Sequence, residues 1–213
     1  MNTRSTLMRS LLARGAAGLA GGALLLGVAG TAMAAEIEVG NDDVDVTVDI
    51  APLTGTGALS MSVAGSSTAL TENGSTGVIR QFTGTLPTVT VTDTRDAADI
   101  PEGAGWYVLG TSTDFVSADG TGTIGAENLG WAPNLIDGGD SGLVAEGDVV
   151  ETAIDGGPDG VGLVDQELLA ITNDSAAIAE EGAWTANAEL FLRTEPTVDA
   201  GQYSSTLTLS LFE

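Results

Sequence analysis

The feature that most restricts how this chain can fold is a two-residue repeat of apolar and polar side chains. Residues 44–50 (VDVTVDI) alternate without a break, and residues 59–63 (LSMSV) and 89–92 (VTVT) do the same. Successive side chains of a β-strand point to opposite faces, so this alternation predicts strands with one buried face. Further candidate strands are residues 78–82, 106–109, 149–154, 186–192 and 205–212.

Turn-forming residues separate these candidate strands. The chain has 30 glycines, and pairs such as Asn73-Gly74 and Asp119-Gly120 favour tight connections. Helical candidates are limited to two short segments, residues 165–171 and 175–181, so an alternating β-α-β arrangement is not expected. The sequence predicts an all-β fold, an antiparallel β-sandwich of Ig-like or jelly-roll-like type. Residues 127–165, rich in Gly and Asp, are expected to form long loops at one end, where binding sites often lie.

The N-terminus has the order of a secretory signal. Arginines at positions 4, 9 and 14 precede an apolar stretch at residues 15–30, and Ala32-Met33-Ala34 offers the small residues that a signal peptidase reads. The alternative is an uncleaved anchor helix, but the stretch is glycine-rich and shorter than the roughly 20 residues that span a bilayer. We therefore expect a signal peptide at residues 1–34 and a single secreted domain at residues 35–213, with no membrane insertion after signal cleavage.

The charge balance bears on the choice of partner. Three of the six basic residues lie within the expected signal and all 30 acidic residues lie after it, so the mature domain would carry 3 − 30 = −27. This charge repels nucleic acid and anionic membranes, which require a basic face. The negative charge is compatible with three roles: it keeps the domain soluble, it attracts divalent cations, or it attracts a polycationic partner.

Missing residue types exclude most enzyme chemistry. After residue 34 the chain has no His, Cys or Lys, which excludes Ser-His-Asp and Cys-His nucleophile systems, a lysine Schiff base and zinc sites built from His or Cys. Paired carboxylates could still serve a glycoside hydrolase. In so acidic a chain such pairs are expected by chance, however, and we predict that the protein is not an enzyme.

Two acidic loops are candidates for calcium, which prefers carboxylate and carbonyl oxygens. One contains Asp137 and Asp140. The other resembles an EF-hand loop, although Gly157 and Gln166 stand where that motif has ligands. Its candidate ligands are Asp155, Asp159 and Asp165. A third acidic cluster is Asn41-Asp42-Asp43. The alternative is that all of these are solvated acidic turns.

Aromatic side chains could provide a binding platform. Trp106 occupies a predicted strand, which favours a core position, although it is retained as a candidate ligand-binding residue. Trp131 lies in a loop-like setting, Leu129-Gly130-Trp131-Ala132-Pro133, and is the aromatic residue most expected to be exposed for a sugar ring or a partner.

Two segments together resemble the WxL-domain surface proteins. Residues 91–95 (VTDTR), followed by Gly105-Trp106 and then Asp114-Phe115, are similar to that family's first signature. Residues 200–211 (AGQYSSTLTLSL) resemble its distal signature, approximately A-G-x-Y-x-x-x-L-T-W-x-L. The chain departs from the family at Leu209, where members have the distal tryptophan, and at Val108, where members have leucine.

The resemblance implies a secreted β-rich domain of Gram-positive bacteria that associates non-covalently with the cell wall through peptidoglycan. The expected function is thus a non-catalytic cell-surface binding or structural module whose partners are a cell-wall polymer or surface proteins. The alternative is a calcium-dependent adhesion or surface-assembly subunit. The last strand should lie centrally in its sheet, and truncation after Gly201 should therefore prevent folding. Its buried face should carry Tyr203, Ser205, Leu207, Leu209 and Leu211.

Overall fold

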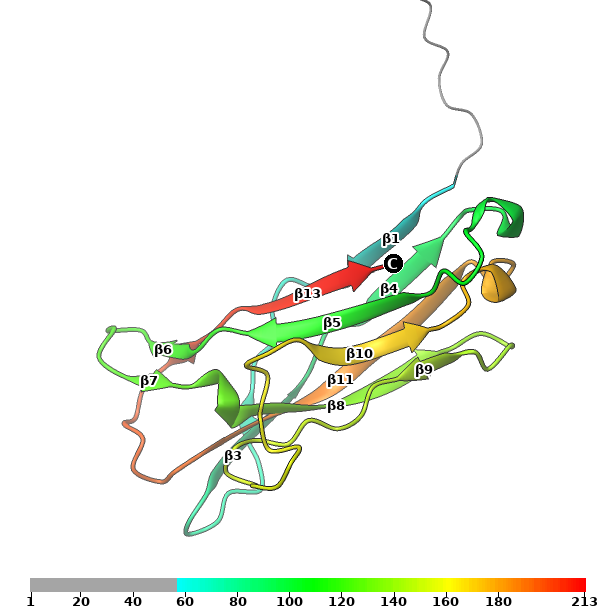
Figure 1. Cartoon of the computed structure of the whole chain (residues 1–213). Helices are drawn as coiled ribbons and strands as arrows, with labels where there is room; N and C mark the ends of the chain where they lie inside the picture. Colours follow the sequence, from blue (N-terminus) through cyan, green and yellow to red (C-terminus); the bar gives the residue numbers. More distant parts are fainter. Residues whose placement is uncertain (1–56) are drawn as a thin grey trace, which may run out of the picture. The chain divides into compact units, whose positions relative to one another are not determined.

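The structure, a computed structural model, describes residues 57–213. Three predicted features lie outside these residues: the signal, the strand at residues 44–50 and the Asn41-Asp42-Asp43 cluster. The described part is all-β and every strand pairing within its sheets is antiparallel, as predicted (Figure 1). The strands are β1 (Leu59–Val63), β2 (Thr71–Glu72), β3 (Arg80–Thr85), β4 (Val89–Asp93), β5 (Trp106–Ser112), β6 (Phe115–Ser117), β7 (Thr123–Ile124), β8 (Leu129–Asp137), β9 (Val144–Glu146), β10 (Glu167–Thr172), β11 (Ala183–Thr194), β12 (Tyr203–Ser204) and β13 (Leu207–Phe212).

The larger sheet is organised around the long strand β11. Its path is β1-β4-β11-β3-β2, and β8 also pairs with β11. Strands β3 and β4 follow one another along β11, but the pairing changes register between Thr85↔Glu189 and Val89↔Ala186. This shift leaves an extra residue at a β-bulge that contains Pro87, a residue with no N–H to donate to the ladder.

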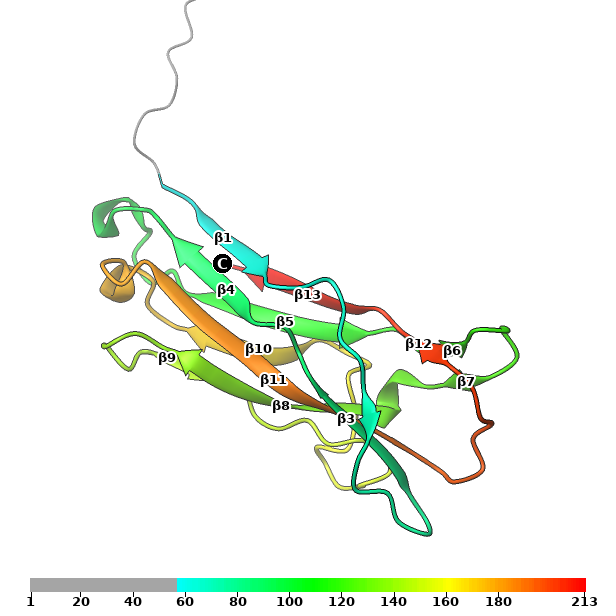
Figure 2. The same ribbon diagram turned by 180° about the vertical axis from the view of Figure 1, so that it is seen from behind.

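The second sheet has the order β13-β5-β10-β9, and a small sheet β12-β6-β7 continues from its β13-β5 end. Figures 1 and 2 show β5 and β10 in one layer and β11 and β8 in the other, with opposite layers in front in the two views. The two layers form the predicted sandwich.

The core lies between these layers and follows from the alternation. Along β11 the even-numbered residues 184–192 are buried, and Trp106 and Val108 of β5 are buried opposite them. The rings of Trp106 and Trp184 lie 5.5 Å apart across the core. Large aromatic side chains contribute most to core burial, so this pair anchors one sheet on the other.

Four predictions of secondary structure were wrong or only partly right. Within the expected loop region 127–165, residues 129–137 form β8, while residues 149–154 make only isolated bridges at Val150 and Glu151. The first helical candidate is largely strand β10, and the second contains a single 3-10 turn at Ala176–Ile178. β8 forms because residues 129–137 pair with β11. This partner strand is more than 45 positions away in sequence, so the local pattern did not indicate the pairing.

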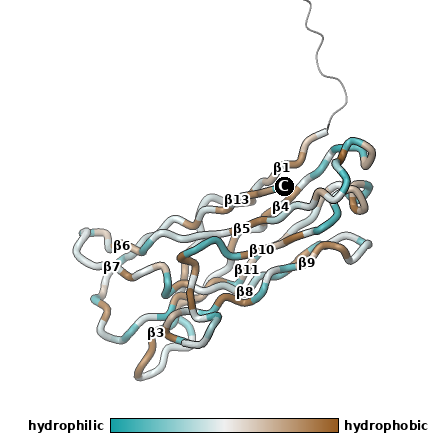
Figure 3. The backbone as a smooth tube through the Cα atoms, in the orientation of Figure 1, coloured by the Kyte–Doolittle hydropathy of each residue, from teal (hydrophilic) through white to brown (hydrophobic). Residues whose placement is uncertain are grey.

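The C-terminal strand does not lie centrally. Among the strands that the structure describes, β13 pairs only with β5 and forms an edge of its sheet, so the prediction of a central position was wrong. Its inward-facing leucines, Leu207, Leu209 and Leu211, are partly buried and pack against the core, as does Tyr203. In Figure 3 the tube is hydrophobic along parts of β13, β10 and β9.

Candidate functional site

The two tryptophans proposed for ligand binding are both core residues. Trp131 lies on β8 with no exposed surface, and Trp106 is 1% exposed. Gly110 provides the space for Trp131, since a Cβ at that position would lie 2.5 Å from Cη2 of the indole. The prediction that Trp131 is exposed was therefore wrong: its strand turns the indole into the sandwich, where it cannot stack on a ligand.

The first acidic loop is held by hydrogen bonds within the protein. Asp137 accepts the backbone N–H of Gly139 at 3.0 Å, and Glu181 accepts that of Ser141 at 2.7 Å. Glu181 also accepts the indole N–H of Trp184 at 2.8 Å, and this hydrogen bond is the main reason that the pKa of Glu181 lies below its ordinary value. Asp140 belongs to the same turn.

In the second acidic loop the cation is an arginine. Arg193 on β11 forms ion pairs with Asp155 and with Glu151, the latter at 3.0 Å. Its guanidinium lies 4.7 Å from the ring centroid of Phe191. Burial opposes ionisation of Asp155, but hydrogen bonds from Thr152 and Arg193 outweigh it, so the pKa of Asp155 lies below its usual value.

The remaining calcium candidates do not converge on Asp155. Asp159 contributes its backbone carbonyl, which accepts the N–H of Glu151 at 3.0 Å. Asp165 lies near Glu167, whose pKa is raised by burial and then by the charge of Asp165. Within residues 57–213, no three acidic side chains form a group that could hold a metal ion.

A buried ion pair occupies the first of the two signature segments. The Asp93 carboxylate, 1% exposed, receives two hydrogen bonds from the Arg95 guanidinium, from Nε at 2.8 Å and from Nη2 at 2.6 Å. The backbone N–H of Arg95 donates a third at 3.1 Å. Nη1 of Arg95 reaches Glu213 at 2.6 Å, which ties the end of β4 to the end of β13. The hydrogen bond from Arg95 lowers the pKa of Asp93. The Asp-x-Arg spacing signalled these residues, but its partner Glu213 could not be identified from sequence.

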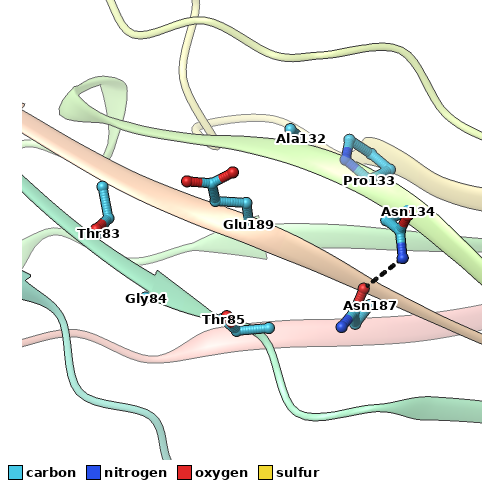
Figure 4. A pocket seen from close by; sticks show the side chains of 8 residues that line it. All are labelled: Thr83, Gly84, Thr85, Ala132, Pro133, Asn134, Asn187 and Glu189. Carbon is cyan, nitrogen blue, oxygen red and sulfur yellow. Dashed lines mark hydrogen bonds between the residues drawn. The ribbon is translucent and has the colours of Figure 1, made fainter.

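A shallow, largely open groove of about 490 Å³ lies on the outer face of the larger sheet, over β3, β11 and β8 (Figure 4). Among the described residues that line it, the only titratable side chain is that of Glu189, which is exposed. Asn134 donates to Asn187 across the β8-β11 pair at 3.1 Å. The lining residues are Thr83, Gly84, Thr85, Ala132, Pro133, Asn134, Asn187 and Glu189. Hydroxyls, amides and one carboxylate can form hydrogen bonds with a polar ligand, but they offer no second acid for glycoside hydrolysis.

An apolar row crosses the outer face of the second sheet. Its members are Tyr107, Leu109, Leu168, Ile171 and Phe212. Tyr107 pairs with Phe212 on one side and with Ile171 on the other, and Leu109 pairs with Leu168. Directly paired residues carry their side chains on the same face, so these residues form one surface. Sequence reasoning missed the row, although residues 106–109 (WYVL) are apolar in both phases of the alternation.

Comparison with known proteins gives no relative: no protein-family model, no curated protein and no solved structure matches this chain. Among the described residues, none belongs to a helix with the length and apolar character needed to cross a membrane.

Proposed function

We propose that this protein is a secreted, non-catalytic module of the bacterial cell surface that binds a cell-wall polymer in the groove over β3, β11 and β8. The groove carries the proposal, because it gathers the amides of Asn134 and Asn187, two threonine hydroxyls and the Glu189 carboxylate on a rigid sheet. Peptidoglycan, with its hydroxyl and amide groups, offers matching donors and acceptors. The WxL-like segments support the same class of ligand.

The position of Leu209 is compatible with this proposal. A Cβ on Gly110 would lie 3.3 Å from Cδ2 of Leu209, next to the Trp131 indole, so the Leu209 side chain faces inward. The departure from the family's tryptophan therefore changes packing beneath β13, away from the groove on the other sheet.

The test is co-sedimentation of the mature secreted form with purified Gram-positive sacculi, with and without millimolar calcium. In the groove, Asn187→Ala removes a side-chain amide and Glu189→Gln removes a carboxylate charge. The control Glu102→Gln makes the same change as Glu189→Gln, but at an exposed turn. A net hydrogen bond contributes roughly 0.5–1.5 kcal/mol, so each groove variant should weaken binding about two- to tenfold.

The control variant should bind as the unmodified protein does. Absence of binding to sacculi in every condition, or equal binding by all three variants, would contradict the proposal. Binding that requires calcium would favour the ion-dependent adhesion alternative.

A further inference from the structure

The groove over β3, β11 and β8 contains an exposed carboxylate, that of Glu189, with no cation beside it. On the middle strand of the groove, β11, Glu189 pairs directly with Thr85 of β3 and with Ala132 of β8. The Cβ atoms of directly paired residues lie about 5 Å apart, and neither neighbour is charged. Figure 4 marks a hydrogen bond between Asn134 and Asn187 and none to Glu189. The carboxylate is therefore accessible to a ligand in the groove.

Within residues 57–213 no basic side chain neutralises Glu189. These residues contain three arginines and neither lysine nor histidine, and no arginine lines the groove. On the same face of β11, Arg193 lies four residues beyond Glu189, which is about 13 Å along a strand. Each arginine already pairs with an acid of its own chain, as Arg80–Glu72, Arg95–Asp93 and Arg193–Asp155. The groove thus offers a negative charge and no positive one.

This distribution of charge restricts the chemical class of the ligand. A carboxylate or phosphate group would approach Glu189 with no cation to pair with, and like charges brought together cost free energy. The net charge of −24 also repels anionic polymers and attracts cations. A neutral ligand would leave the charge of Glu189 unused. An ammonium group, by contrast, carries three donors and forms charge-assisted hydrogen bonds with a carboxylate.

The amides beside Glu189 provide a second contact. Asn187 lies two residues before Glu189 on the same face of β11, which is about 7 Å along the strand. Its side-chain oxygen accepts a hydrogen bond from Asn134, which leaves the NH₂ group of Asn187 as a donor to a ligand. A ligand that fits both groups has an ammonium and, about 7 Å from it, a carbonyl or hydroxyl oxygen.

We propose that the groove recognises a primary ammonium group of the wall polymer. Glu189 pairs with the ammonium, and the Asn187 amide donates to an oxygen of the same ligand. Amino sugars without an N-acetyl group and peptide side-chain amines both carry such an ammonium, so the chemistry has two sources. This inference rests on the proposed function, because it names the group that the same groove binds. The proposed function does not require it, because a neutral polymer can hydrogen-bond to the same amides and hydroxyls.

The test compares labelled ligands that differ only at the amine. One pair is a glucosamine tetrasaccharide and its N-acetylated form, and the other is a lysine tripeptide with a blocked N-terminus and its side-chain-acetylated form. Fluorescence anisotropy at low salt should show that the mature secreted form binds the free amine of at least one pair about two- to fivefold more tightly, as for an exposed ion pair. The preference should shrink as NaCl is added, because salt screens exposed charges. The pair that shows the preference identifies the source of the ammonium.

Variants assign the preference to one carboxylate. Glu189→Gln should abolish the preference for the free amine. Glu102→Gln is the control, because it removes the same charge at an exposed turn outside the groove, and it should retain the preference. Asn187→Ala should weaken both members of a pair by a similar factor, since both carry the oxygen that its amide contacts. Melting curves verify that each variant is folded.

The inference is overturned if neither pair shows a preference for the free amine, if Glu189→Gln retains the preference, or if Glu102→Gln loses it to the same extent. Sacculus binding that Asn187→Ala weakens, without any preference for the amine, would leave the proposed function standing without this inference. A preference that depends on Glu189, without binding to sacculi, would leave the inference about the ammonium standing without the proposed function.

Discussion

At the scale of single residues, the described structure depends on close approaches that only glycine permits. Gly110 lies directly against the Trp131 ring, and Gly105 lies against the backbone of the neighbouring strand, where a Cβ would be 2.3 Å from the Thr172 carbonyl oxygen. Both contacts join segments distant in sequence. Their requirement for glycine is a packing requirement, since neither residue has a positive φ.

We predict that Gly110→Ala destabilises the protein by about 1–3 kcal/mol, because the new methyl group collides with a fully buried indole that has little room to move. Urea unfolding followed by tryptophan fluorescence measures the change. Gly77→Ala is the control, since a Cβ there meets no atom within 4 Å. Equal stability of Gly110→Ala and the unmodified protein would show that the core accommodates the methyl group.

The Asp93–Arg95 pair makes a second prediction at this scale. Asp93→Asn should cost about 1.5–3 kcal/mol at neutral pH, because it removes a carboxylate that receives charged hydrogen bonds. The folded-state pKa of Asp93 is lowered, so its contribution is complete above the unfolded-state pKa of about 3.9 and is lost as pH falls through the folded-state pKa.

The measurement is the free energy of unfolding from pH 7 down to pH 2 for Asp93→Asn and the unmodified protein. The difference between them should shrink below about pH 4. Asp96→Asn, at an exposed carboxylate whose side chain forms no capping hydrogen bond, serves as control and should follow the unmodified protein. A constant difference across the whole range would mean that Asp93 acts by packing alone.

At the scale of elements, β13 combines an edge position with a core-facing side. It covers the outer edge of β5, its three leucines pack on the core, and Glu213 holds Arg95 at its end. An edge strand of this kind contributes burial that no other described element replaces. The prediction from sequence that this segment is required for folding therefore remains, although its central position was wrong.

Truncation after Gly201 removes β12 and β13, and we expect the shortened protein to lose cooperative unfolding. Circular dichroism during heating, with gel filtration to detect aggregation, tests this expectation. Removal of Glu213 alone is the comparison, since it breaks only the outer contact of Arg95 and should leave a cooperative transition at somewhat lower temperature. A truncated protein that stays monomeric and melts cooperatively would contradict the requirement.

At the scale of the whole molecule, charge repulsion opposes the compact state. The chain has a formal net charge of −24, and the three described arginines are already paired. Net charge far from zero destabilises a compact protein through self-repulsion, and salt screens that repulsion. The melting temperature should therefore rise with ionic strength.

The expected result is a rise of several degrees between low salt and about 0.5 M NaCl, measured by differential scanning fluorimetry. Calcium chloride matched to the same ionic strength separates screening from binding. Equal shifts in the two salts would indicate screening alone, in agreement with the absence of a metal-binding group in residues 57–213. A much larger rise in melting temperature with calcium chloride would favour the alternative of a calcium-dependent adhesion or surface-assembly subunit.

The fold class followed from sequence because alternation is a local signal. Six of the seven candidate strands that fall in the described residues correspond to strands. Along β11 the even-numbered residues 184–192 are buried, although Phe191 on the other face is buried as well. By contrast, strand order, the edge position of β13 and the existence of β8 depended on pairing between distant segments. Hydrogen bonds of a sheet link residues far apart in the chain, and no local pattern specifies the partner.

For the candidate sites, too, some properties followed from the sequence and others depended on the tertiary structure. The sequence by itself determined that histidine, cysteine and lysine are absent and that the molecule is acidic and strand-rich, because these properties belong to the residues themselves. Only the tertiary structure decided that Trp131 is buried, that Arg193 neutralises the acidic loop at Asp155, and that a groove and an apolar row lie on opposite sheets. Whether a side chain reaches solvent or a partner depends on which strand packs over it, and that is set by the three-dimensional fold.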